Sequence, residues 1–84
     1  MRDTEGRTYA GATVDLESLQ LSAVQVAVAM ASSSAAPGLE AVAVLGDSTT
    51  AADADIAAVR DLAGTGVAFY VAAPDGSVLE SSTT

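Results

Sequence analysis

The sequence predicts an α/β fold for this chain of 84 residues, and three observations support that prediction. The apolar run at residues 16–31 is long enough for a helix. Two short apolar runs, at 39–46 and 67–72, are bounded by turn residues, as buried strands are. An amphipathic stretch at 51–63 separates those two runs. Strands that alternate with helices are typical of an α/β layer with right-handed crossovers.

The run at residues 16–31 is the longest apolar segment, and its periodicity is ambiguous. Val24, Val26 and Val28 alternate as residues in a strand do. Leu21, Val24 and Val28 recur like one face of a helix. The length favours a helix, because strands usually have about five or six residues. A second apolar face would comprise Leu19, Ala23, Val26, Ala27 and Met30. A helix with two apolar faces must be covered on more than one side.

The first residues predict a turn followed by a strand. Gly6 ends a charged segment and is expected at positive φ. Residues 7–14 favour a strand, in which Gly11 indicates a bulge or a close approach of two backbones. Asp15 and Ser18 are the candidate caps of the next helix.

The second half of the chain predicts two strands around a helix. Residues 39–46 form a continuous apolar run, as in a strand buried on both faces. The helix at 51–63 has three cap candidates before it, and Gly64 and Gly66 end it. The cap candidates are Ser48, Thr49 and Thr50. The strand at 67–72 is followed by a turn at Pro74-Asp75-Gly76, a short strand at 77–80 and a frayed end.

The composition excludes several classes of protein. The chain has no cysteine and no histidine, so disulfides, thiolate metal sites and imidazole bases are not available. A formal net charge of −8 disfavours nucleic acid and anionic membranes as partners. The apolar run is shorter than the roughly 18 residues of a membrane span, and the N-terminus has no signal-peptide pattern. We therefore expect an acidic cytoplasmic protein that forms one small domain over residues 1–84.

Four successive segments resemble the small cytidine deaminases, which are zinc-dependent nucleoside deaminases. They are RTYAGATVDLESLQLSAVQVAVAMA, LEAVAVLGDS, ADIAAVRDLAG and VAFYVAAPDGSVLE. In the family the corresponding segments carry Asn-x-Glu, a helix that opens with Cys-Ala-Glu-Arg, and a helix that opens with Pro-Cys-Gly-x-Cys. The resemblance covers nearly the whole chain. It implies a cytidine-deaminase-like three-layer sandwich with a mixed sheet, from which the N-terminal helix and first strand are absent.

On this resemblance the chain begins at the first hairpin turn, with Gly6 and Gly11 at the family's hairpin glycines. The family's first strand lies in the middle of its sheet. Residues 7–14 would then pair directly with 39–45 or borrow a strand from another copy, because unpaired backbone inside a sheet is costly. We therefore expect a homo-oligomer, unless residues upstream of Met1 belong to the natural protein.

The resemblance also shows which chemistry is missing. The family's three zinc ligands fall on Ser22, Asp55 and Ala58, and its catalytic glutamate falls on Val24. A register two residues later puts Val24 and Val26 at the first ligand and the glutamate. Zinc supplies the hydroxide in these enzymes, and the glutamate moves the proton. With one possible oxygen ligand left, we expect no zinc, no other cofactor, no catalytic residue and no hydrolytic deamination.

Other polar residues have a functional and a structural interpretation. By resemblance Thr13 and Asp15 take the places of the family's ribose-binding residues, although a strand end and a helix cap commonly carry them too. The carboxylates Asp47, Asp53, Asp55 and Asp61 match no calcium loop, and the dipole of a helix favours acids at its start. Gln25 is interpreted as a buried hydrogen-bonding group at an interface or as a solvent-facing residue. Gly64-Thr65-Gly66 precedes a strand and is therefore a cap and turn instead of a phosphate loop.

Three functions follow from these patterns. The first is a catalytically inactive, cytidine-deaminase-like structural or interaction module that self-associates through the helix containing Val28 and Met30. The second is a module that binds a nucleoside without hydrolysing it. The third is a deaminase-type enzyme acting without zinc, or an inactive partner of an active deaminase.

Overall fold

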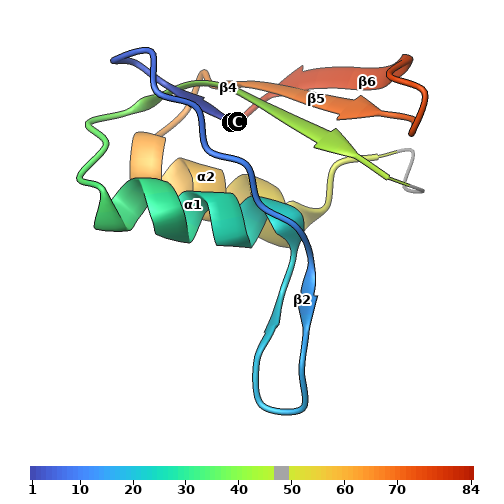
Figure 1. The fold of residues 1–84 in the computed structure, drawn as a ribbon. Helices are drawn as coiled ribbons and strands as arrows, with labels where there is room; N and C mark the ends of the chain where they lie inside the picture. Colours follow the sequence, from blue (N-terminus) through green and yellow to red (C-terminus); the bar gives the residue numbers. More distant parts are fainter. Residues whose placement is uncertain (47–49) are drawn as a thin grey trace.

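The computed structural model describes residues 1–46 and 50–84. Their secondary-structure elements are β1 (Arg2–Asp3), β2 (Val14–Asp15), β3 (Gln20–Leu21), α1 (Ala23–Ser33), β4 (Leu39–Leu45), α2 (Asp53–Ala63), β5 (Ala68–Ala72) and β6 (Val78–Thr83). Four strands form a sheet in the order β1-β4-β5-β6, in which only β4 and β5 are parallel. Both helices cover the same face of this mixed sheet (Figure 1). The predicted α/β fold is confirmed.

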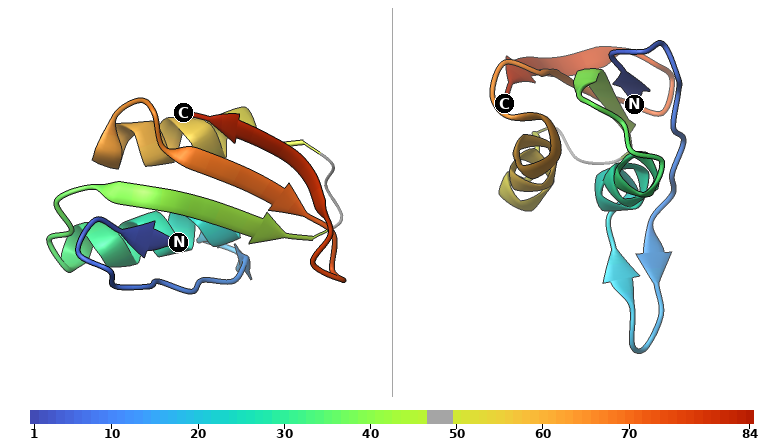
Figure 2. Two further views of the ribbon diagram at one scale, coloured as in Figure 1. Left: turned by 90° about the horizontal axis from the view of Figure 1, so that it is seen from above. Right: turned by 90° about the vertical axis from the view of Figure 1, so that its left-hand side faces the viewer.

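The prediction of a helix over residues 16–31 is wrong for the first third of that segment, which forms part of a hairpin. β2 and β3 pair with each other and extend away from the sheet and helices (Figures 1 and 2). Leu16 and Leu19 lie in the tip, where the Leu16 N–H donates to the Leu19 carbonyl at 2.9 Å. α1 begins at Ala23 with Ser22 as its N-cap. Neither predicted cap, Asp15 or Ser18, is used.

The start of α1 is fixed by a capping box. The Ser22 hydroxyl accepts from the Gln25 N–H at 3.1 Å, and the Gln25 side chain accepts from the Ser22 N–H at 2.9 Å. Two otherwise unpaired N–H groups of the first turn are satisfied in this way. Gln25 is therefore a capping residue, which neither of its two predicted roles included.

The core lies between the sheet and the helices. Its largest fully buried apolar side chains are Phe69, Val42 and Val59. Val24, Ala27 and Ala31 are the buried residues of α1, whereas Met30 is 40% exposed, so α1 is covered mainly on one side. The prediction that β4 is buried on both faces is wrong. Val42 faces the helices, but Ala43 and Leu45 are exposed on the other side of the sheet.

The N-terminal segment differs from the expected one. Residues 1–3 precede the turn, and Arg2 and Asp3 pair with β4, so the turn at Gly6 follows a strand instead of opening the chain. The N–H of Tyr9 donates to the carbonyl of Met1 at 2.7 Å, and Arg2 forms a bridge with Thr8. β1 thus lies between β4 and residues 7–9, and the predicted strand at 7–14 is reduced to this contact and β2.

Both glycines of this segment behave as predicted. Gly6 has φ 85° in the turn after β1. A Cβ on Gly11 would lie 2.9 Å from the Ala23 carbonyl oxygen and 3.0 Å from the Ala27 nitrogen. Gly11 therefore permits the predicted close approach of two backbones, here with α1.

The C-terminal half follows the sequence more closely. α2 has Ala52 as its N-cap, without a side-chain hydrogen bond, so Thr50 does not cap it. Ser48 and Thr49, the other cap candidates, lie outside the described residues, as does Asp47. Gly64, at φ 74°, ends α2 as predicted, and the turn at 74–76 is confirmed by Gly76 donating to the Ala73 carbonyl.

The prediction that the C-terminus frays is wrong. β6 continues to Thr83, and Thr84 is buried. The Thr84 hydroxyl donates to the Gly64 carbonyl at 3.0 Å and accepts from the Val67 N–H at 3.1 Å. The last residue therefore fastens the loop between α2 and β5.

Candidate functional site

A cavity of about 360 Å³ lies where α1 and α2 begin and β4 ends. Its polar lining includes Thr13, Ser22, Thr50 and Asp55, and its apolar lining includes Phe69. β4 and β5 are parallel, and ligands of open α/β sheets bind beyond the carboxyl ends of such strands. The cavity is therefore the candidate functional site of the described chain.

One hydrogen bond joins the two helices at this cavity. The Ser22 hydroxyl donates to Asp55 Oδ1 at 2.5 Å. Asp55 is the third residue of α2 and is 9% exposed. Its carboxylate lies in the first turn of a helix, where the dipole favours negative charge. The contact therefore fixes the start of α1 against the start of α2.

Thr13 and Asp15 line one open groove of about 330 Å³ at the base of the hairpin, but only Thr13 also lines the cavity. Thr13 lines the cavity together with Ser22. Asp15 is exposed and pairs with Gln20 through its backbone. The structure therefore brings Thr13 to the cavity with Ser22 and Asp55, and leaves Asp15 outside it.

Comparison with known proteins identifies the family. The family model described as cytidine deaminase-like matches residues 1–76. The chain belongs to the cytidine deaminase-like family. Neither the curated proteins nor the solved structures include a match to the chain. The family match includes both helices and the cavity residues described above.

The positions that the resemblance assigns to the family's zinc ligands do not all lie at the cavity. Ser22 and Asp55 meet there, whereas Ala58 lies one turn further along α2. Ala58 lines a separate groove of about 250 Å³ that Val28 and Asp61 also line. Val24, the first-ligand position in the shifted register, is buried in the core.

Ala52 is a cavity residue that the sequence interpretation missed. It lines the cavity, and it precedes Asp55 by three residues, which is the spacing of the family's paired cysteines. The signal that could have located it is the start of α2, because the first residues of α2 lie beside Ser22 at the start of α1. Ser22, Ala52 and Asp55 are thus the positions that converge in space.

The zinc that the cytidine deaminase-like family implies does not fit these residues. A structural or catalytic zinc takes at least three protein ligands, usually thiolate, imidazole or carboxylate. Here the converging side chains are a methyl group, a hydroxyl and a carboxylate, and the hydroxyl already donates its proton to the carboxylate. Among the described residues no three acids gather into a metal-binding group, so Asp53, Asp55 and Asp61 do not form one.

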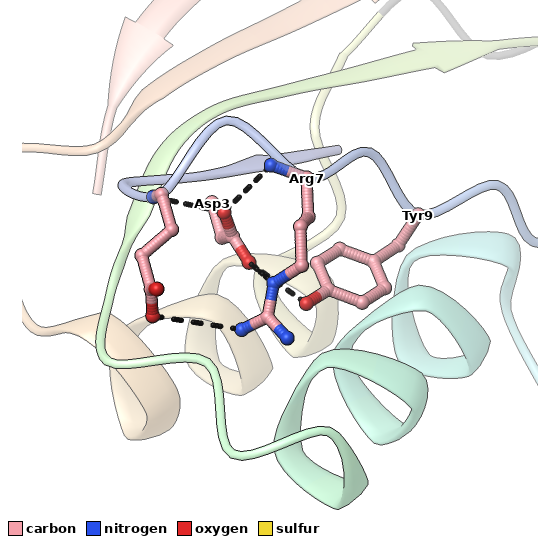
Figure 3. A network of polar contacts seen from close by, with 4 residues as sticks. Asp3, Arg7 and Tyr9 are labelled. Atoms are coloured by element: carbon pink, nitrogen blue, oxygen red, sulfur yellow. Dashed lines mark hydrogen bonds and ion pairs between the residues drawn. The ribbon is translucent and has the colours of Figure 1, made fainter.

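A second polar cluster lies at the other end of the sheet, around Asp3 (Figure 3). Asp3 is fully buried. Asp3 Oδ1 accepts from the N–H groups of Glu5 and Arg7, each at 2.9 Å. Asp3 Oδ2 accepts from the Arg7 guanidinium at 2.9 Å and the Tyr9 hydroxyl at 2.8 Å.

These hydrogen bonds determine the ionisation of the cluster. Burial opposes the charge on Asp3, but the bonds from Tyr9, from the two N–H groups and from Arg7 outweigh it and lower its pKa to about 2. The hydrogen bond to Asp3 raises the pKa of Tyr9. The sequence interpretation missed this cluster, and the Asp-x-x-x-Arg-x-Tyr spacing around Gly6 is its only local signal. Because all four contacts of the Asp3 carboxylate are with residues of the same segment, the cluster stabilises the turn.

Proposed function

We propose that this cytidine deaminase-like chain has no deaminase activity and serves as a structural or interaction module. The hydrogen bond between Ser22 and Asp55 carries the proposal. It joins the two helices at the place where, by the family resemblance, a metal would join them. On this proposal the Ser22–Asp55 hydrogen bond connects the two helices in place of a metal. The metal that generates hydroxide in the family is then missing.

The residues at the cavity support this assignment. Without a metal to lower the pKa of water, deamination would depend on Asp55 as the base, and one of its oxygens accepts the Ser22 hydroxyl. No histidine or cysteine exists elsewhere in the sequence to replace it. Thr13 and Thr50 are neutral hydroxyls that cannot act as a base near neutral pH.

The direct test combines an activity assay with metal analysis. The purified chain is mixed with zinc and cytidine, and uridine formation and retained zinc are measured. We expect no uridine above the buffer rate and no zinc after gel filtration. Uridine formation that is lost in Asp55→Asn but kept in Asp53→Asn would overturn the proposal. Asp53 is the matched control because it also lies in the first turn of α2.

Restoring the ligands provides a sharper version of the test. The variant with Ser22→Cys, Ala52→Cys and Asp55→Cys places three thiols at the positions that converge in space. The control with Ser22→Cys, Asp55→Cys and Ala58→Cys places them at the positions matched by sequence. We expect the first variant to retain zinc about tenfold or more tightly than the second, measured by competition with a chromogenic chelator. Equal zinc affinities of the two variants would contradict the assignment of Ala52, instead of Ala58, as the third position at the cavity.

Self-association is part of the same proposal. Large apolar side chains are exposed on the hairpin tip and on α1: Leu16 at 60%, Leu19 at 48% and Met30 at 40%. A two-stranded hairpin is marginally stable when nothing packs against it, so a second copy that covers it would stabilise it. Light scattering after size exclusion should give an oligomer, and Leu16→Glu should lower the measured mass. A monodisperse monomer that unfolds cooperatively would overturn this part.

The location of the protein completes the proposal. Within residues 1–46 and 50–84, no helix has the length and apolar character needed to cross a bilayer. The absence of cysteine and the acidic composition support a cytoplasmic location.

Nucleoside binding without hydrolysis is the second candidate, and the cavity supports it. Its volume of about 360 Å³ is within the usual range for small-ligand sites, and Thr13, Ser22 and Asp55 supply polar groups. A ligand at about 100 times its dissociation constant stabilises the fold by about 2.7 kcal/mol. Thermal unfolding with cytidine, uridine and adenosine should then show a shift of several degrees that Thr13→Val reduces. If no nucleoside changes the midpoint of thermal unfolding, nucleoside binding is contradicted and only the structural or interaction module is supported.

A further inference from the structure

We propose that the cavity at the start of α1 and α2 binds a small organic cation, a primary ammonium group on a compact apolar body, which donates a hydrogen bond to Asp55 Oδ2. The inference rests on the proposed function, in which this cavity holds no metal. It names a ligand whose chemical class differs from that of the nucleosides considered above.

One oxygen of the Asp55 carboxylate is available to a ligand. Oδ1 accepts the Ser22 hydroxyl at 2.5 Å, and no described residue donates to Oδ2. Among the described residues, every side-chain oxygen that is buried from solvent has a hydrogen-bond partner. Oδ2 is therefore reached from the cavity that Asp55 lines, although the residue as a whole is only 9% exposed. A carboxylate oxygen in this position requires a donor, which water or a ligand supplies.

The chain supplies no cation to this carboxylate. Its three basic residues are Arg2, Arg7 and Arg60. Arg2 and Arg7 form ion pairs with acidic residues elsewhere in the fold, and none of the three is among the described residues that line the cavity. Asp55 is the one charged side chain of that described lining. The cavity therefore holds a negative charge without a positive partner, in a chain whose net charge of −8 attracts cations.

The walls of the cavity define the body of the ligand. On the side of the sheet they include Val44 of β4 and Phe69 and Val71 of β5. These side chains offer no oxygen to a metal ion or its bound water, but they can cover an apolar body, and Phe69 can pack against an aromatic ring. The volume of about 360 Å³ is sufficient for a small ligand. The lining therefore favours an ammonium ion with an aromatic or aliphatic body over a hydrated metal ion.

The other polar groups fit a cation better than an anion or a neutral molecule. An ammonium group has three N–H donors, and Thr13 and Thr50, which also line the cavity, carry hydroxyl oxygens that are further acceptors. A phosphate or carboxylate would meet the Asp55 charge and no positive group. Nucleosides are neutral near pH 7 and would leave that charge without a counter-ion.

The test is an NMR titration of the full chain, free of metal, with phenethylamine near neutral pH. The amide signals of Ser22, Gly46 and Asp55 should shift saturably, with a dissociation constant of about 1 mM or lower for a ligand of this size. The matched probe is 2-phenylethanol, in which a neutral hydroxyl replaces the ammonium group. It should bind about tenfold more weakly or worse, because a charge-assisted hydrogen bond is lost.

Two variants separate the cavity carboxylate from the charge of the whole chain. Asp55→Asn removes the charge and keeps the shape, so it should weaken phenethylamine by about tenfold or more. It should change the affinity for 2-phenylethanol by less than about twofold, because the alcohol makes no charge-assisted bond. Asp53→Asn makes the same change of net charge in the first turn of α2, at an exposed position. Exposed charges are screened, so this variant should change the affinity for the amine by less than about twofold.

A third variant tests the cavity without changing the carboxylate. Ala52 lines the cavity and is the exposed, extended N-cap residue of α2, where a larger side chain is compatible with the fold. Ala52→Leu should fill part of the cavity and weaken phenethylamine by about tenfold or more. This variant keeps the proposal falsifiable if Asp55→Asn does not fold, since unchanged affinity in Ala52→Leu would contradict the assigned cavity.

Three further results would overturn the proposal. The first is the absence of saturable shifts at about 10 mM phenethylamine. The second is equal affinity for the amine and the alcohol. The third is an equal loss in Asp55→Asn and Asp53→Asn, because net charge alone would then attract the amine. None of these results produces uridine or retains zinc, so this inference and the proposed function can fail separately.

Discussion

Two buried aspartates show how differently one fold uses the same side chain. Asp3 is fully buried and accepts four hydrogen bonds from Glu5, Arg7 and Tyr9. Asp55 accepts a side-chain hydrogen bond from Ser22 alone and lines a cavity. A carboxylate has about four acceptor positions, so Asp3 is saturated and Asp55 is not. The first therefore stabilises the fold, and the second retains capacity for a ligand.

Removing the saturated carboxylate should have the largest effect on stability. Asp3→Asn puts an amide group where two donors now meet a carboxylate oxygen, and it leaves the Arg7 charge without its partner. We expect the melting temperature to fall by about 10 °C or more. Calorimetry measures the change. Glu5→Gln is the control, because its contact with Arg7 spans 3.7 Å at the surface and should contribute little.

Acid should unfold the chain through the same residue. The folded-state pKa of Asp3, about 2, lies below the ordinary value near 3.9. A depressed pKa contributes stability that is fully present above pH 4 and is lost as the pH falls from about 4 to about 2. Urea midpoints measured at several pH values in this range should fall for the parent chain. The decrease should be smaller in Asp3→Asn, and an equal decrease in both would contradict the role assigned to Asp3.

The segment between the two clusters can be tested at Gly11. A methyl group there would lie 2.9 and 3.0 Å from backbone atoms of α1, which cannot move as a side chain can. Gly11→Ala should therefore lower the free energy of unfolding by about 1–3 kcal/mol, measured in urea. Gly46→Ala is the matched control, because nothing lies within 4 Å of its added methyl group. It should be neutral or stabilise by about 0.4–1 kcal/mol.

How much the sequence reveals differs between the two halves of the chain. α2, β5 and the glycine turns at 64 and 76 were predictable, because each depends on local periodicity or on a conformation that glycine favours. The hairpin was not, since residues 16–31 match a helix and a strand equally well over short windows. The Ser22-x-x-Gln25 spacing was the available signal for the start of α1.

The two polar clusters were harder to predict than the elements that hold them. Asp3, Arg7 and Tyr9 are close in sequence, but only packing against the rest of the fold buries Asp3 and Tyr9. Ser22 and Asp55 are 33 residues apart, so the position of α2 relative to α1 decides which residue Ser22 meets. A motif match alone therefore does not establish which residues of α2 lie beside Ser22. That choice decides between Ala52 and Ala58 as the third position at the cavity.

The smallest effect on stability is expected for the hydrogen-bonded pair of Ser22 and Asp55. Ser22→Ala removes the N-cap of α1 and the bond to Asp55, which together should cost about 1–2 kcal/mol in urea unfolding. Ser33→Ala is the control on the same helix, because its hydroxyl makes an exposed bond to Met30 at the other end. If Ser22→Ala and Ser33→Ala lower the free energy of unfolding by the same amount, the Ser22–Asp55 bond does not contribute to stability. A larger cost at Ser22, with no further loss when Asp55→Asn is added, would show that the two side chains act as one cross-link.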